Sequence, residues 1–190
     1  IGKCTVKADL HKGLPRTKYT ITIVPEMAFG TGHHETTSLV MEGMQKEEKN
    51  IKDIQVLDMG CGTGILSILA VKMKAKLPVH AIDIDPTAVF SVRENAWKNR
   101  AHEKISSLCG DASLIQAGKY DLILANINRN ILLQDMSTYS RGLLPGGMLI
   151  ISGFYTQDIP MLREEAEKCS LKFEYELEKE NWAAAKFTKI

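Results

Sequence analysis

The sequence predicts an α/β fold: a seven-stranded, mostly parallel sheet with one antiparallel strand and helices on both faces. Three observations lead to this expectation. Residues 54–69 run from a short apolar segment through a glycine turn into apolar residues at helical spacing. Residues 79–83 form a second apolar segment that ends in an acid. Residues 120–127 are nearly all apolar, as expected of a strand that helices cover on both sides.

The glycine turn contains Asp58, Gly60, Gly62 and Gly64. Glycines let the backbone come close to a ligand, and the N–H groups that open the following helix face it. The dinucleotide fingerprint requires a third glycine three residues after the second, and this position is Ile65. The alternating glycines instead resemble the nucleotide loop of S-adenosylmethionine-dependent methyltransferases. On its own, the pattern is as consistent with a plain strand-to-helix turn as with a ligand site.

Asp83 supports the ligand interpretation. It ends a strand about 20 residues after the glycine turn, which is the spacing that brings a carboxylate to a ribose in a βαβ unit. The neighbouring pair Asp85-Pro86 is suited to begin a helix. We therefore interpret Asp85 as a helix cap and Asp83 as the acceptor for the two ribose hydroxyls.

Two further strand ends carry polar side chains. Asp111 follows the expected strand at 105–109, where it contacts an adenine amino group or simply ends the strand. Asn126 lies at the carboxyl end of the strand at 120–127. Open α/β sheets place ligands and chemistry at this edge.

Residues 25–37 are too rich in glycine, threonine and histidine for regular structure. They precede an amphipathic helix and fit a lid over a small ligand, with the Thr37 hydroxyl presented to the charged end of the ligand. The adjacent residues His33 and His34 suggest a metal, but two histidines do not complete a zinc site. No metal is expected.

The remaining segments continue the alternation. Helices are expected at 65–74, 86–99, 130–144 and 160–169, and strands at 148–152, 171–177 and 183–188. Residues 144–147, Leu-Pro-Gly-Gly, are predicted as a turn that leads into the strand at 148–152. The last two strands are too close in sequence for a parallel crossover, so we expect them to form a hairpin.

Composition narrows the function classes. With 24 basic and 23 acidic residues, the formal net charge of +1 gives no general reason to expect nucleic acid or a membrane surface as a partner. Lys72, Lys74 and Lys76 are interpreted as a solvated helix end. No apolar run approaches the ~20 residues of a membrane span. The four cysteines show no Cys-x-x-Cys pair, so reduced thiols and a cytoplasmic location are expected.

The segment Met27-Ala28-Phe29-Gly30-Thr31-Gly32 with Thr36-Thr37, the glycine turn, Asp83 and Asn126 together resemble the PrmA family. These are methyltransferases of the eleventh protein of the large ribosomal subunit. The resemblance covers residues from about 25 to the C-terminus. It implies the Rossmann-like fold of class I methyltransferases, S-adenosylmethionine as cofactor and an amino group of a ribosomal protein as acceptor.

The resemblance also implies roles for individual residues. Cofactor contacts are expected from Thr37, Gly60, Asp83 and Asn126, and the rest of the turn (Asp58, Gly62, Gly64) and Asp111 are expected in the same site. Asn126 and Phe29 are the expected catalytic residues, Phe29 because its lid should lie near the transferred methyl group. Asn126 and the backbone oxygens of Ile127 and Asn128 are of the type that orients an amine.

Family members carry a separate N-terminal recognition domain, and this chain begins at Ile1. We therefore expect residues 1–24 to be a linker with short strands, and 25–190 to be the catalytic domain. The β-like runs at 5–8 and 19–24 are interpreted as a small hairpin or part of that linker. The chain is expected to act as a monomer without direct nucleic-acid binding.

Three other functions share parts of this pattern. A methyltransferase of the same fold acting on RNA or a small molecule is the main alternative. A cofactor-binding module without catalysis is disfavoured by the intact turn and Asn126. An NAD-linked dehydrogenase is disfavoured by the glycine spacing.

Overall fold

The computed structural model describes residues 1–8, 17–24 and 34–190. The expected lid, with Phe29, Gly30, Gly32 and His33, lies outside the described residues. The expected catalytic role of Phe29 therefore stays a prediction.

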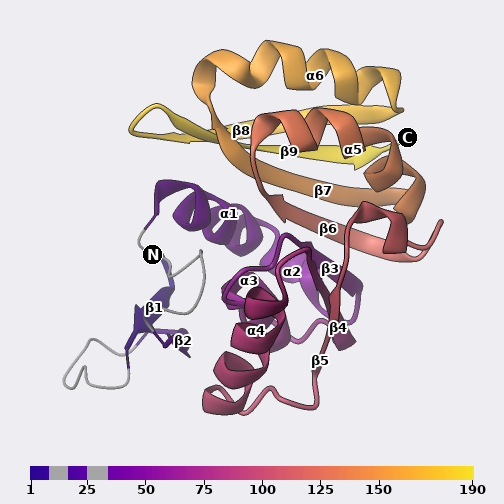
Figure 1. Ribbon diagram of the computed structural model, residues 1–190. Coiled ribbons are helices and arrows are strands. Elements are labelled where there is room, and N and C mark those ends of the chain that lie inside the picture. The colour runs from indigo at the N-terminus through magenta and orange to yellow at the C-terminus, as the bar shows by residue number, and fades with distance from the viewer. Residues whose placement is uncertain (9–16, 25–33) are drawn as a thin grey trace.

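A seven-stranded sheet forms the centre of the protein, in the order β5-β4-β3-β6-β7-β9-β8 (Figure 1). Its strands are β3 (Gln55–Met59), β4 (Lys76–Asp83), β5 (Ile105–Cys109), β6 (Tyr120–Asn126), β7 (Leu143–Tyr155), β8 (Leu171–Lys179) and β9 (Trp182–Lys189). Only β9 runs antiparallel to its neighbours, β7 and β8. The expected mostly parallel sheet with one antiparallel strand is confirmed.

Helices cover both faces of this sheet. They are α1 (Glu35–Lys46), α2 (Glu48–Ile51), α3 (Ile65–Lys72), α4 (Pro86–Lys98), α5 (Arg129–Gly142) and α6 (Ile159–Lys168), with 3₁₀ turns η1 (Ala112–Leu114) and η2 (Thr156–Asp158). Side chains on opposite faces of strand β6 contact different helices. Ile123 and Ala125 pack with α5 and α6, whereas Leu122 and Leu124 pack with α1 and α3. None of the described helices is both long and apolar enough to cross a membrane.

A second, two-stranded sheet is formed by β1 (Cys4–Lys7) and β2 (Tyr19–Thr22). The strands pair in parallel, with Cys4 opposite Tyr19, so the hairpin interpretation of this region is wrong. The parallel register lets Cys4, Tyr19 and Ile21 all enter the core beneath α1 and α3. Burial of these apolar side chains accounts for a pairing that local sequence does not indicate.

Strand β7 begins earlier than predicted. It includes Leu143, so the turn expected at 144–147 lies inside the strand. Tyr120 pairs with Leu143 and Leu122 pairs with Met148, so β7 has extra residues at this point. The Pro145-Gly146-Gly147 segment is thus accommodated as an irregularity of the strand rather than as a turn before it.

Candidate active site

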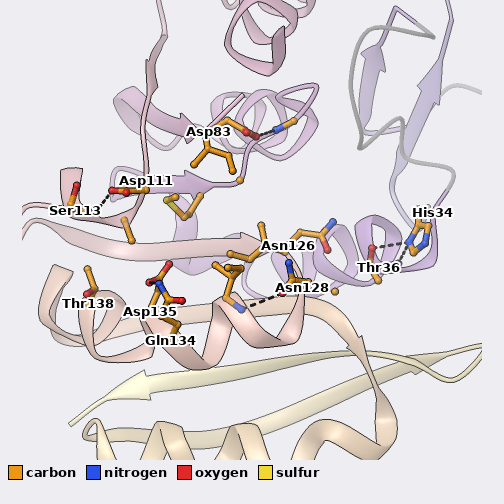
Figure 2. Close-up of a pocket in the computed structure, with 18 of the residues that line it drawn as sticks. His34, Thr36, Asp83, Asp111, Ser113, Asn126, Asn128, Gln134, Asp135 and Thr138 are labelled. Atoms are coloured by element: carbon orange, nitrogen blue, oxygen red, sulfur yellow. Dashed lines mark hydrogen bonds between the residues drawn. The ribbon is translucent and has the colours of Figure 1, made fainter. Parts of the chain in front are cut away.

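A cavity of about 870 Å³ opens at the carboxyl edge of the sheet. Figure 2 shows its labelled side chains converging from several strand ends and from α5. Its lining includes Gly60 and Gly62 after β3, Asp83 at the end of β4, Asp111 after β5 and Asn126 at the end of β6. The structure therefore brings these five predicted residues together.

Asp83 joins the glycine turn to the end of β4. Its Oδ2 accepts a hydrogen bond from the Gly62 N–H over 2.9 Å, and its Oδ1 accepts one from the Asp85 N–H over 3.0 Å. Two carboxylate oxygens offer about four acceptor sites, so acceptor capacity remains for a ligand. Asp85 Oδ1 accepts the Thr87 N–H over 2.8 Å, which confirms the predicted cap of α4.

Gly60 allows the turn to approach the segment that follows β6. Its φ is +70°, and a Cβ at this position would lie 2.2 Å from Ile127 Cγ2. A similar close approach occurs on the opposite strand, where a Cβ on Gly153 would lie 2.1 Å from the Ile127 carbonyl oxygen. All three residues line the cavity, so its wall is formed by closely packed backbone.

Asp58 and Gly64 are not among the residues that line the cavity. Asp58 is fully buried, and its Oδ2 accepts hydrogen bonds from the Ser67 N–H (3.0 Å) and the Ser67 hydroxyl (2.6 Å). Burial raises the pKa of this carboxyl to about 6. Gly64 caps α3 in the left-handed conformation, with a φ of +78°. Both residues position the first turn of α3, and through it the glycine turn.

Asn126 is held by Thr37. The Asn126 Nδ2 donates to the Thr37 hydroxyl over 3.1 Å, whereas the buried Asn126 Oδ1 has no hydrogen-bond partner within the described part of the chain. Thr37 is 1% exposed and does not line the cavity, although its neighbour Thr36 does. Thr37 therefore contacts Asn126 rather than the cavity, and the Oδ1 atom of Asn126 is the acceptor left without a partner.

The segment after Asn126 uses its polar groups locally. Asn128 caps α5, with its Oδ1 accepting the Asn130 N–H (3.1 Å) and the Ile131 N–H (3.2 Å). The Asn128 carbonyl accepts the Leu132 N–H over 3.1 Å. Of the oxygens expected to orient an amine, the Asn128 carbonyl is thus already engaged in the helix.

Asp111 lies beside the cavity and also caps η1. Its Oδ1 accepts the Ser113 N–H over 2.9 Å, and hydrogen bonds from Ser113 lower the pKa of Asp111. The cap of η1 leaves other lone pairs of the Asp111 carboxylate free, and the contact with an adenine amino group stays a prediction.

Three aromatic rings form one end of the site. The sequence places His34 in the expected lid but does not identify Tyr155 or Trp182 as site residues. The His34 ring meets the Trp182 ring edge-on at 5.0 Å, and Trp182 stacks on Tyr155 at 4.2 Å. Trp182 and His34 line the cavity. Trp182 opens β9 opposite Tyr155 at the end of β7. Their proximity depends on an antiparallel register that residue spacing does not reveal.

One face of α5 forms another wall of the cavity. It contributes Gln134, Asp135, Thr138 and Arg141, of which Figure 2 labels the first three. These polar residues recur at helical spacing, and this signal was available in the sequence. Burial raises the pKa of Asp135.

The described residues form neither a metal-binding cluster nor a disulfide bond. Within 1–8, 17–24 and 34–190, no group of three His, Cys, Asp or Glu side chains lies close enough to hold a metal ion. His34 instead caps α1, with its Nδ1 accepting the Thr36 N–H over 3.3 Å. The four cysteines carry free thiols.

Comparison with known proteins assigns the family. The profile of the family described as "Ribosomal protein L11 methyltransferase (PrmA)" matches residues 2–190. The chain belongs to the PrmA family. It is 48% identical over 186 residues to a protein of Phocaeicola vulgatus named "Ribosomal protein L11 methyltransferase", covering 97% of this chain and 65% of that relative. A relative of the same name from Porphyromonas gingivalis is 50% identical over 187 residues, covering 98% of this chain and 63% of that relative. The chain thus spans just under two thirds of the length of these PrmA relatives.

Solved structures agree with this family assignment. The crystal structure of the ribosomal protein L11 methylase of Lactobacillus delbrueckii subsp. bulgaricus superposes with a TM-score of 0.87 at 27% identity, covering 99% of this chain and 96% of that chain. An S-adenosylmethionine-dependent methyltransferase from Mesorhizobium loti superposes with a TM-score of 0.68 at 11% identity, covering 83% of this chain and 99% of that chain. The expected Rossmann-like methyltransferase fold is confirmed.

Proposed function

We propose that this chain is the catalytic part of an S-adenosylmethionine-dependent methyltransferase that methylates amino groups of ribosomal protein L11. The names of its PrmA relatives support the activity and the acceptor. The arrangement at the carboxyl edge of the sheet supports the chemistry. The unpaired Oδ1 of Asn126 is the observation on which the proposal mainly rests.

The cavity fits the proposed cofactor. Asp83 ends β4 with acceptor capacity left for ribose hydroxyls. Gly60 has no side chain to fill the space beside Ile127. Asp111 and Ile84 line the part of the cavity beyond Asp83, where a base would lie. When bound, S-adenosylmethionine supplies an electrophilic methyl group and a neutral thioether leaving group.

Asn126 is placed to orient the acceptor amine. A buried amide oxygen without a partner costs about 1–3 kcal/mol, so a donor at this point is favourable. A neutral amine that donates an N–H to this oxygen has its lone pair directed elsewhere in the cavity. Holding the two reactants in such an orientation lowers the barrier by several kcal/mol.

The acceptor ammonium must also lose a proton, which passes to solvent before the methyl transfer. The reference pKa of a lysine amine is near 10.4. The chain lowers it by desolvation, because Met59, Ile127 and Trp182 form apolar parts of the cavity wall. A dedicated base is therefore not required. The Trp182 ring, stacked on the exposed ring of Tyr155, forms an apolar entrance for a lysine stem.

Transfer of a tritiated methyl group tests this proposal. The purified chain and the labelled cofactor are incubated together in three separate reactions. One reaction contains ribosomal protein L11, the second ribosomal RNA and the third a small-molecule extract. Label in L11 alone is the expected result. Label in RNA or in the extract identifies a different acceptor class. Cofactor binding without label in any sample shows a module that binds without catalysis.

A further inference from the structure

The amino-terminal edge of the sheet, opposite the active site, carries two adjoining hollows. One has a volume of about 770 Å³ and the other about 450 Å³, and Lys74 lines both. We call the lysines of these hollows the lysine face: Lys3, Lys18, Lys49, Lys52, Lys72, Lys74, Lys76 and Lys104. Lys49, Lys72 and Lys76 belong to α2, α3 and the start of β4. The others lie just before β1, β2 and β5, after α2, and between α3 and β4.

Charge in this protein is strongly segregated. The eight lysines share the two hollows with only two carboxylates, Glu48 and Asp53, which leaves six positive charges in excess. The whole chain has a formal net charge of only +1, so the rest of it carries five more acidic than basic residues. The balanced overall charge, which gives no reason to expect a polyanion, hides this basic surface.

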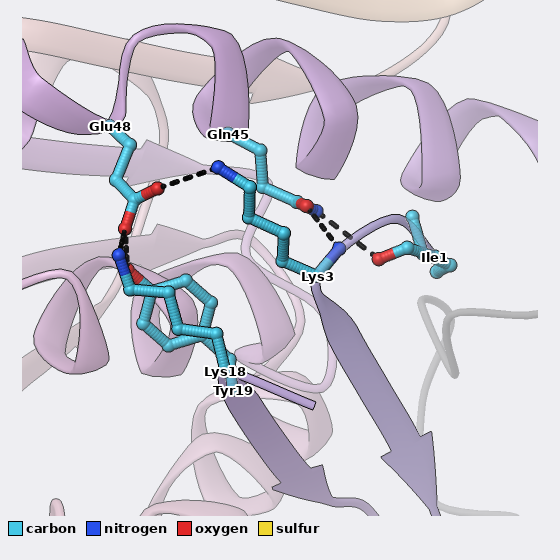
Figure 3. Close-up of polar contacts among 6 residues, drawn as sticks. All are labelled: Ile1, Lys3, Lys18, Tyr19, Gln45 and Glu48. Atoms are coloured by element: carbon cyan, nitrogen blue, oxygen red, sulfur yellow. Dashed lines mark hydrogen bonds and ion pairs between the residues drawn. The ribbon is translucent and has the colours of Figure 1, made fainter. Parts of the chain in front are cut away.

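The two carboxylates are already engaged. Figure 3 shows Lys3 and Lys18 both reaching Glu48, the first over 3.4 Å. Lys52 lies 3.6 Å from Asp53. Among the described residues, the other five lysines of the face have no carboxylate within 4.0 Å. Most of the face is therefore free to meet an anionic partner.

Lys72 gives a second indication. It is half-buried at the end of α3, and burial lowers its pKa. Removing an ammonium from water without a counterion costs free energy, so an anion at this site is stabilising. Lys104 adds to the unfavourable charge around Lys72. The cluster is thus more than a set of independent, fully solvated side chains.

We propose that the lysine face binds the phosphodiester backbone of a double-stranded nucleic acid. Protein–protein interfaces are depleted in lysine and rely on apolar or aromatic anchors. Here the aromatic Tyr19 and the apolar Met73 are buried, and Leu77 is the half-exposed apolar exception. Single-stranded nucleic acids are held by stacking on aromatic rings, which the hollows do not expose. Lysines act as point charges toward phosphates, without reading the base sequence.

The lysine face and the active site are separate. Lys76 opens β4 and Asp83 ends it, so the length of this eight-residue strand, roughly 25 Å, lies between them. A duplex on the lysine face leaves the cavity accessible. This inference goes beyond the proposed methyl transfer and does not depend on it.

Fluorescence anisotropy with labelled RNA and DNA duplexes of the same sequence tests the proposal. The variant Lys49→Gln/Lys74→Gln/Lys76→Gln removes three exposed charges of the face that have no carboxylate partner among the described residues. The control variant Lys168→Gln/Lys172→Gln/Lys179→Gln removes three exposed charges from α6 and β8. We expect wild-type and control proteins to bind with the same strong salt dependence. The lysine-face variant should bind at least about tenfold more weakly, and its log–log salt slope should fall by about 2–3, because each phosphate contact contributes about 0.9.

Thermal unfolding and cofactor titration of each variant establish that its fold and active site are intact. The proposal is overturned if the wild-type chain fails to bind either duplex at low salt. It is also overturned if the two triple variants weaken duplex binding equally. Tighter binding of a polyglutamate peptide than of either duplex also overturns it and points to an acidic protein. A preference between the RNA and DNA duplexes identifies the source of the phosphates. None of these outcomes depends on methyl transfer.

Discussion

The Nδ2 atom of Asn126 lies 3.1 Å from the hydroxyl oxygen of Thr37, and this contact joins the end of β6 to the first turn of α1. Because Thr37 holds the nitrogen of the amide, the oxygen is the atom left without a partner. The two residues are 89 positions apart in the chain. The orientation of the proposed amine acceptor therefore depends on how α1 docks against the sheet.

The first prediction concerns this pair. Asn126→Ala should lower kcat for methyl transfer by about 100-fold, the order of loss that accompanies misplaced reactants. Thr37→Val, which keeps the shape but removes the hydroxyl, should lower kcat by a smaller factor and leave the KM for the cofactor nearly unchanged. Steady-state kinetics with saturating acceptor measure both. The control is Ser38→Ala, because among the described residues the Ser38 hydroxyl bonds only to the Glu35 carbonyl, within its own helix. Wild-type kcat in Thr37→Val would contradict a positioning role.

Asp83 is the second test. Asp83→Asn should weaken cofactor binding by ~1–3 kcal/mol, because the amide cannot accept from both ribose hydroxyls while also anchoring the glycine turn. Isothermal titration calorimetry gives the affinity. Asp85→Asn is a matched control, since asparagine is an equally good N-cap and Asp85 does not line the cavity. Unchanged affinity in Asp83→Asn removes it from the cofactor site.

The third prediction uses the close approach of Gly60 and Ile127. Gly60→Ala should abolish measurable cofactor binding and lower the Tm, because the new Cβ would lie 2.2 Å from Ile127 Cγ2. Adding Ile127→Ala removes the clashing methyl group and should recover part of both losses. The recovery should be incomplete, because alanine at a φ of +70° costs about 1–2 kcal/mol. A double-mutant cycle on the free energy of unfolding measures the coupling. Additive effects of the two substitutions would show that the clash is not the cause.

The fourth prediction follows from the buried carboxyl of Asp58. Burial raises the pKa of Asp58 to about 6 in the native state, whereas an unfolded aspartate titrates near 3.9. Between these values the native state keeps a proton that the unfolded state has lost, so stability falls as the pH rises from about 4 to about 6. The total is roughly 3 kcal/mol. Asp58→Asn keeps an oxygen for Ser67 but does not titrate.

Urea unfolding at pH 4 and at pH 7 measures this effect. The wild-type free energy of unfolding, relative to that of Asp58→Asn, should be about 2 kcal/mol higher at pH 4 than at pH 7, because about half of the unfolded aspartates are already ionised at pH 4. Parallel profiles for wild type and Asp58→Asn would show that Asp58 ionises normally in the native state.

The sequence was informative wherever the site depends on local order. Asp83 and Asn126 were predictable because each ends an apolar strand, and parallel strands bring such ends to one edge. The place of Trp182 beside His34 was not predictable, because it requires β9 to pair antiparallel with β7 and α1 to begin near both strands. The same limit applies to the parallel pairing of β1 with β2 and to the lysine face. Each is assembled from segments whose contact is decided by tertiary packing rather than by neighbouring residues.

The last prediction concerns an ion pair that ties the junction of α1 and α2 to β9. Lys186 Nζ lies 3.0 Å from Glu47 Oε1, and their side chains are only 13% and 10% exposed. Asn50 also donates to this carboxylate over 2.9 Å. Burial alone would raise the pKa of Glu47, but hydrogen bonds from Asn50 and Lys186 outweigh it and lower the pKa. The pair's contribution to stability is thus present above the unfolded pKa and is lost as the pH falls through the lower native value.

Lys186→Met should lower the free energy of unfolding by about 3–5 kcal/mol, because it leaves the Glu47 carboxylate buried without its counterion. Glu47→Gln/Lys186→Met should recover much of this loss, since no unpaired charge remains. Lys172→Met removes the exposed pair with Glu174, 3.6 Å away, and should cost at most about 1 kcal/mol. Denaturant unfolding at neutral pH compares the stability of the three variants.

Glu47 directly follows α1, the helix that carries Thr37. A large loss of stability in Lys186→Met should therefore be accompanied by lower methyl transfer at temperatures below the Tm. Full activity there would show that the docking of Thr37 does not depend on this pair.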